Sequence, residues 1–139
     1  MSRIICLDYG LKRTGIAVTD PMRIIASALN TIDTKELMNF LKSYISSEPV
    51  GKILIGEPYN LDGSDTHATR PVKDFMKKLK KEFPSIEIES IDEQFSSKMA
   101  MRAMIDMNMK KKKRREKGMI DQIAAAIMLQ EYLENSGGK

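Results

Sequence analysis

The sequence predicts an α/β protein built on a mixed five-stranded sheet with helices on both faces. Two observations predict it: the first third of the chain has the pattern of three strands joined by short turns, and the remainder alternates helical with strand-like segments. A meander gives antiparallel neighbours, whereas strands separated by helices pair in parallel, so together they imply a mixed sheet. The 139 residues contain no internal repeat and no long linker, and we expect a single domain over residues 1–139.

Three strands are expected in the first third of the chain. Ile4–Leu7 is a short, continuously apolar run that ends at Asp8, which is typical of a buried strand ending at a sheet edge. The pattern resumes as a second strand over Ile16–Thr19 and, after the break at Pro21, as a third over Ile24–Leu29.

Helices and strands alternate in the rest of the chain. Asp33 and Glu36 have the spacing of a capping box, and apolar residues at helical spacing follow them until Pro49. The remaining expected elements are strands over Lys52–Gly56 and Ile86–Ile91 and helices over residues 72–79, from Ser96 or Ser97 to Met109, and from about Met119 to Leu133.

Positive charge is concentrated in one segment. The chain has 23 Lys and Arg against 19 Asp and Glu, a formal net charge of +4. Lys110–Lys117 alone holds seven basic residues and one acid, so the rest of the chain is slightly acidic. Such a run is either a solvated loop or a contact surface for a polyanion, and its place before the last helix favours contact with nucleic acid phosphates.

The composition excludes several classes of protein. No apolar run approaches the roughly 20 residues that span a bilayer, and Ile4–Leu7 is too short for the core of a signal peptide. Cys6 is the only cysteine, so no internal disulfide can form. We therefore expect a cytoplasmic protein that is neither membrane-bound, nor a secreted disulfide scaffold, nor a zinc finger.

Acidic residues follow the expected strands. Asp8, Glu57 and Glu93 each stand at a strand end, and Asp121 shares a helix face with small alanines that allow close approach to a sheet. Each has a plainer interpretation: Asp8 as the cap of a turn, Asp121 as an acid favoured by the helix dipole, and Glu93 as a solvated loop residue. Convergent carboxylates without a His or Cys cluster fit a hard cation, Mg²⁺ or Mn²⁺, which can promote phosphodiester hydrolysis.

Four segments resemble the YqgF/RuvX-like family. They match its motifs in order over nearly the whole chain, at the family's length, which makes the resemblance specific. The segments are residues 8–17 (DYGLKRTGIA), 56–64 (GEPYNLDGS), 92–97 (DEQFSS) and 121–130 (DQIAAAIMLQ).

The resemblance implies an RNase H-like fold and a nuclease that depends on Mg²⁺ or Mn²⁺. It implies that Asp8, Glu93 and Asp121 are the catalytic acids and the metal ligands. Glu57, at the end of the fourth strand, is a further candidate ligand ranked below Glu93. The family is associated with maturation of the 5′ end of 16S ribosomal RNA and was earlier classed with Holliday junction resolvases. The residues expected to contact substrate phosphates are Lys12, Arg13, Lys110, Lys111, Lys112, Lys113, Arg114 and Arg115.

Two positions depart from the family pattern, and three functions stay open. Gln94 replaces an arginine that could pair with a phosphate, and Glu57 stands where many relatives have an apolar residue. The leading prediction is a nuclease, monomeric or homodimeric, that processes a ribosomal RNA precursor. A resolvase of branched DNA, which would require a dimer, and a non-catalytic RNA- or ribosome-binding module are the alternatives.

Overall fold

The computed structural model describes residues 2–57, 69–92 and 117–136. Within these ranges the chain forms five strands, three α-helices and one short 3₁₀ helix, η1. In chain order they are β1 (Arg3–Asp8), β2 (Arg13–Thr19), β3 (Ala26–Asp33), η1 (Thr34–Glu36), α1 (Leu37–Ser47), β4 (Val50–Glu57), α2 (Thr69–Glu82), β5 (Glu87–Asp92) and α5 (Lys117–Ser136). The helix expected to end at Met109 lies outside the described residues. No described helix is both long enough and apolar enough to cross a membrane.

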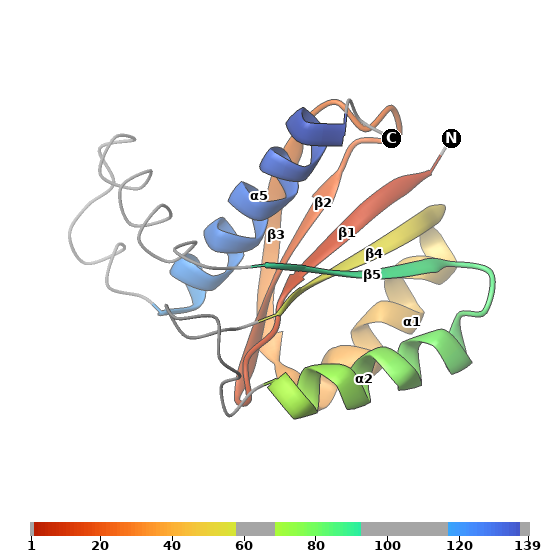
Figure 1. The fold of residues 1–139 in the computed structure, drawn as a ribbon, viewed down its shortest axis with the longest axis vertical. Coiled ribbons are helices and arrows are strands. Elements are labelled where there is room, and N and C mark those ends of the chain that lie inside the picture. Colours follow the sequence, from red (N-terminus) through yellow and green to blue (C-terminus); the bar gives the residue numbers. More distant parts are fainter. Residues whose placement is uncertain (1, 58–68, 93–116, 137–139) are drawn as a thin grey trace.

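The strands form one mixed sheet, as the sequence predicts. Its order is β3-β2-β1-β4-β5. β2 is antiparallel to both β1 and β3, whereas β4 is parallel to both β1 and β5. The parallel strands β1, β4 and β5 therefore all finish at the same end of the sheet. Figure 1 shows α5 on one side of the sheet and α1 and α2 on the other.

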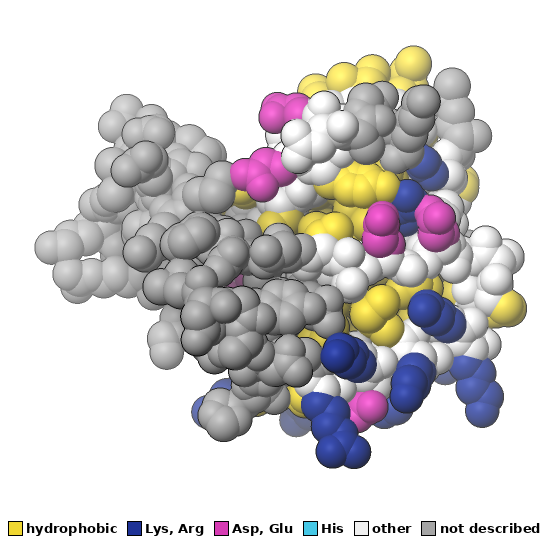
Figure 2. All heavy atoms as spheres, in the orientation of Figure 1, with side chains coloured by type: hydrophobic (Ala, Val, Ile, Leu, Met, Phe, Trp, Pro, Cys, Tyr) yellow, Lys and Arg dark blue, Asp and Glu magenta, His cyan; other side chains and the backbone are white. Residues whose placement is uncertain are grey.

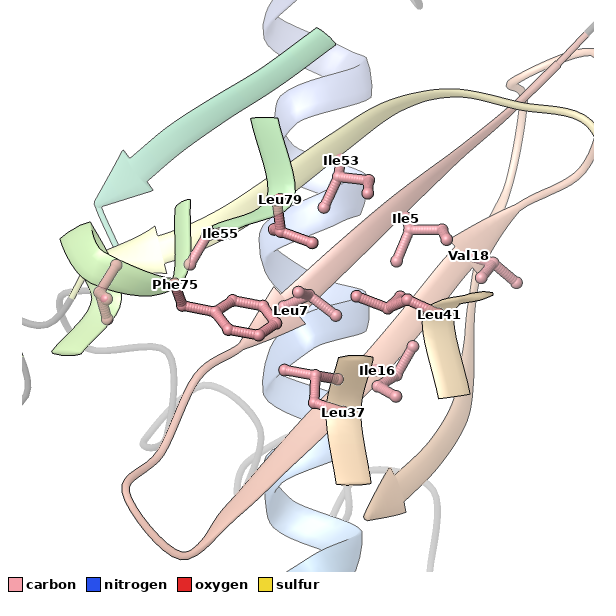
Figure 3. Close-up of a cluster of buried hydrophobic side chains, with 11 residues drawn as sticks. Ile5, Leu7, Ile16, Val18, Leu37, Leu41, Ile53, Ile55, Phe75 and Leu79 are labelled. Carbon is pink, nitrogen blue, oxygen red and sulfur yellow. The ribbon is translucent and has the colours of Figure 1, made fainter. Parts of the chain in front are cut away.

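The side chains of β1 point alternately into two hydrophobic clusters, one on each face of the sheet. Ile5 and Leu7 face α1 and α2, where they pack with Leu41, Phe75 and other apolar residues in the cluster of Figure 3. Ile4 and Cys6 point to the opposite side and pack under α5. Because successive residues of a strand alternate between faces, the next position on the α5 side is Asp8.

The third strand begins later than its apolar pattern predicts. Ile24 and Ile25 belong to the turn between β2 and β3, where they are 59% and 61% exposed. The carboxylate of Asp20 accepts hydrogen bonds from the backbone N–H groups of Met22, Ile24 and Ile25 at 2.8–3.1 Å, which fixes the turn. The predicted range Ile24–Leu29 is thus wrong at its start, because local side-chain capping outweighs β propensity there.

A helix begins after Asp33, as its spacing predicts, but the side chain of Asp33 does not form the expected capping hydrogen bond. Asp33 ends β3 opposite Arg13 of β2, with an extended backbone, and within the described residues its side chain caps no helix. Thr34 instead ties the chain to the β1–β2 loop: its hydroxyl donates to the carbonyl of Gly10 at 2.6 Å and its N–H to the carbonyl of Lys12 at 3.0 Å. Strand pairing thus keeps Asp33 extended, and α1 begins only at Leu37.

A polar network near the amino end of β4 holds α5 against the sheet. The Lys52 ammonium of β4 donates to the hydroxyl of Tyr132 at 2.5 Å and forms ion pairs with Glu87 at 2.8 Å and Glu89 at 3.6 Å. Burial opposes the charge of Lys52, but hydrogen bonds to Glu87 and Tyr132 outweigh it and raise the pKa of the ammonium. The network holds α5 across β4 and β5.

Candidate active site

Asp8 lies at the carboxyl end of β1, on the α5 side of the sheet. Its Cα partner across the antiparallel ladder is Gly15 of β2, and two positions earlier, on the same face, Cys6 pairs with Ala17. Directly opposed residues of an antiparallel pair point to the same face. Cys6 and Ala17 both pack in the cluster under α5, so the half-buried Asp8 carboxylate is directed to the same side.

Gly15 brings Asp121 to the same place. A Cβ atom on Gly15 would lie 2.2 Å from both the carbonyl carbon and the carbonyl oxygen of Asp121, and 2.6 Å from the backbone nitrogen of Gln122. The backbone of α5 therefore rests on the bare Cα of Gly15, the residue that pairs with Asp8. Two acids that are more than 100 residues apart in sequence thus lie on the same side of one sheet end.

Arg13 holds the Asp121 carboxylate in this structure. Its Nε donates to Oδ2 of Asp121 at 2.5 Å, and the two side chains are 37% and 22% exposed. A pocket of about 360 Å³ opens beside the pair and is lined by Gly10, Leu11, Lys12, Arg13 and Asp121. Arg13 was expected to contact phosphate; it lies at the pocket where a phosphate would enter, bound to an acid of the proposed site.

The loop after Asp8 is fixed from the other face of the sheet. The ring of Tyr9 packs against Phe75 of α2 with centroids 5.3 Å apart. Burial, together with the nearby charge of Asp74, raises the pKa of the Tyr9 hydroxyl, which therefore stays protonated at neutral pH. With Thr34 bonded to Gly10 and Lys12, the loop is anchored at both ends. Lys12 at its tip is exposed.

Several expected site residues lie outside the described part of the chain. They are Glu93, the side chain of Glu57, Gln94, and the basic residues Lys110–Arg115. The backbone of Glu57 pairs with that of Asp92 at the common carboxyl edge of β4 and β5.

The described acids fit part of a cation site. Asp8 and Asp121 supply the carboxylate oxygens that Mg²⁺ and Mn²⁺ prefer. Within residues 2–57, 69–92 and 117–136, no three acidic, histidine or cysteine side chains gather as a metal-binding group. A complete ligand set would therefore need a further donor from elsewhere in the chain.

Comparison with known proteins identifies the family. The sequence model of the family described as "RuvX: Holliday junction resolvase" matches residues 2–135. The chain belongs to the RuvX family. Two RuvX relatives are each named "Putative pre-16S rRNA nuclease": the Flavobacterium psychrophilum protein is 50% identical over 96% of this chain and 97% of its own length, and the Christiangramia forsetii protein is 47% identical over 96% and 98%.

A solved structure shows that this RuvX protein shares the RNase H-like fold. The structure of T. thermophilus RuvC in complex with a Holliday junction substrate superimposes with a TM-score of 0.58. The match covers 99% of this chain and 98% of that one, at 12% sequence identity. The predicted fold class is thereby confirmed.

Two features of the RuvX site were not predicted from the sequence. The alanines of the Asp121 helix predict its close approach to the sheet, but the contact with Gly15 was not predicted, because the second strand was expected to begin only at Ile16. The contact of Tyr9 with α2 had no local signal, because it joins the first loop to a helix more than 60 residues away.

Proposed function

We propose that this RuvX protein is a metal-dependent endonuclease that hydrolyses phosphodiester bonds at the 5′ end of the 16S ribosomal RNA precursor. The names of its relatives support the substrate, and the family match supports nuclease chemistry. We take residues 1–139 as one nuclease domain that acts in the cytoplasm, where bacterial ribosomal RNA is made.

One observation carries the proposal. Asp8 and Asp121 come from opposite ends of the chain, yet the Gly15 contact sets both at one end of the sheet and on one face. Core packing needs only the apolar residues of α5 and does not require an acid at residue 121. Two carboxylates brought together at a strand end, beside an open pocket, are typical of a site that binds a cation and a phosphate.

We assign the third carboxylate of the site to Glu93. Ile91, two residues earlier in β5, packs on the α5 side, and the two-residue period of a strand favours residue 93 over Asp92 for that face. Glu57 is a further candidate ligand. These carboxylates would hold Mg²⁺ or Mn²⁺ in a site of the two-metal type. Bound there, the cations supply Lewis-acid stabilisation of the charge that develops on the phosphate.

The residues of the β1–β2 loop orient the substrate in this proposal. Arg13 borders the pocket, and its guanidinium matches the geometry of a phosphate as well as that of a carboxylate. Arg13, which pairs with Asp121 in this structure, would pair with a substrate phosphate in the complex. Lys12 and the Lys110–Arg115 segment are proposed as further phosphate contacts.

Replacing Arg13 by glutamine is expected to tighten Mn²⁺ binding by roughly threefold to tenfold, because the cation no longer competes with a guanidinium for the Asp121 carboxylate. Titration calorimetry on the metal-free protein measures the change. Lys12→Gln is the matched control, since it removes the same charge from an exposed neighbour that is not paired with Asp121. Equal Mn²⁺ affinities of the Arg13→Gln variant and wild type would show that the Arg13–Asp121 ion pair does not compete with the cation.

Holliday junction resolution is the second candidate, because the family description names that activity. One experiment separates the two. Wild-type protein is incubated with Mn²⁺ or Mg²⁺ and either an RNA that spans the 5′ end of 16S ribosomal RNA or a four-way DNA junction, in one buffer. We expect cleavage of the RNA, and its loss when EDTA removes the cation.

The outcomes of that comparison are distinct. Symmetric nicking of the junction with intact RNA would favour the resolvase. Binding of the RNA without cleavage at millimolar Mn²⁺ would favour the non-catalytic binding module that Gln94 suggests. RNA cleavage that persists in EDTA would contradict a metal-dependent site.

A further inference from the structure

The outer side of α2 is a basic surface outside the site described above. Its six cations, all exposed, form the basic face of α2: Arg70, Lys73, Lys77, Lys78, Lys80 and Lys81. The opposite side of the helix buries Val72, Phe75 and Leu79 in the core. Figure 2 shows Lys and Arg side chains gathered along the lower part of the molecule, where Figure 1 places α2.

The described part of the chain provides no ion-pair partner for these cations. Of the two acids on α2, Glu82 is paired with Lys42 of α1 at 3.3 Å. Within the described part of the chain, no carboxylate lies within ion-pair distance of any cation of the basic face. Lys73 and Lys77, and Lys77 and Lys81, are four residues apart and repel each other.

The stability of α2 does not explain why the helix carries all six cations. Cations in the last turn, such as Lys80 and Lys81, are favoured by the helix dipole. Arg70 lies in the first turn, where the dipole disfavours positive charge, and that turn holds no acid. Lys73, Lys77 and Lys81 form one row of like charges that lowers the stability of the helix, and a helix that keeps such a row is typical of a binding surface.

α2 lies on the face of the sheet opposite the proposed active site and contacts the loop that follows Asp8. Phe75 of α2 packs against Tyr9, the residue that follows Asp8. The same loop presents the exposed Lys12. α2 is therefore joined to the β1–β2 loop at Tyr9, and its basic face is exposed on the side of the sheet opposite α5. With 14 residues, α2 is about 21 Å long, which is enough to follow several nucleotides of a strand.

We infer that the basic face of α2 binds the sugar–phosphate backbone of the RNA substrate beyond the cleavage site. The inference rests on the proposed nuclease function and extends it: the protein engages a strand longer than the pocket beside Asp121 can hold. Lysines on a convex helix bind phosphates without reading bases, so the surface adds affinity and not sequence specificity.

The test replaces Lys73, Lys77 and Lys81 together by glutamine. Binding of a fluorescent 30-nucleotide RNA to the full-length protein is measured by anisotropy in EDTA over a range of salt concentrations. The triple variant is expected to bind roughly tenfold more weakly at 50 mM salt, and the slope of log K against log[salt] falls by about 2. Because repulsion is relieved, its melting temperature without RNA should equal or exceed that of wild type at low salt.

A matched variant with arginine at the same three positions keeps the charge and should retain wild-type affinity. If wild type binds and cleaves RNA while the glutamine variant binds equally well with the same slope, the inference fails and the proposed function stands. If wild type neither binds nor cleaves RNA, the proposed function fails. Loss of binding in the arginine variant, or wild-type binding to phosphatidylserine vesicles in place of RNA, would also overturn the inference.

Discussion

The Asp8→Asn variant is expected to lose RNA cleavage by roughly a thousandfold or more. Asparagine keeps the shape of the side chain but removes the charge that would hold a cation, and cation stabilisation of a phosphoryl transition state is worth several kcal/mol, with about 1.4 kcal/mol for each tenfold in rate. Asp8 ends a strand whose Ile4–Leu7 segment is fully buried, so its position is fixed by the sheet and not by a mobile loop.

Two further measurements make the Asp8 result specific. The melting temperature of Asp8→Asn should stay close to that of wild type, because asparagine has the size of aspartate and keeps the backbone pairing with Gly15. Glu131→Gln is the matched control: it removes one carboxylate from the exposed surface of α5 and should leave cleavage unchanged. Cleavage by Asp8→Asn within threefold of wild type would remove Asp8 from the proposed mechanism.

Much of the fold follows from local patterns in the sequence. The continuously apolar run of β1, the alternation of β5 and the helical spacing in α2 each report burial directly, and the structure confirms the elements they predict. The position of Asp8 at the end of β1 was also predicted, because this acid ends an apolar run. Periodicity carried these predictions because burial in a layered fold follows the strand and helix periods.

The predictions that failed concern where elements begin, how helices are capped and which distant residues form ion pairs. Ile24 and Ile25 have strand propensity, but the capping of the turn by Asp20 keeps them out of β3. Asp33 precedes a helix, as its spacing predicts, but in the part of the chain that the structure describes its side chain makes no capping hydrogen bond. The Arg13–Asp121 ion pair joins residues 108 apart, and no single segment of the sequence could reveal it.

Gly15 is the residue on which the proposed site most depends. Its Cα pairs with Asp8 on one side, and the backbone of Asp121 rests directly on it. Because the atoms that a Cβ would meet belong to the backbone of α5, the conflict cannot be relieved by a change of rotamer. The whole helix would have to move away from β2, and the cluster of Cys6, Ala17 and Ala125 would lose its packing.

The Gly15→Ala variant is therefore expected to be destabilised by at least about 3 kcal/mol and to lose cleavage with it, since overpacking against a rigid backbone costs more than the usual core insertion. Denaturation by urea measures the change in the free energy of unfolding. Gly51→Ala is the control: its Cβ would meet Oγ of Ser2 at 2.4 Å and Nη2 of Arg23 at 2.7 Å, and both are ends of flexible side chains that can move. We expect that control to cost less than about 1 kcal/mol. Equal stability of the two variants would mean that α5 does not bear on Gly15, and Asp121 would then lose the contact that places it beside Asp8.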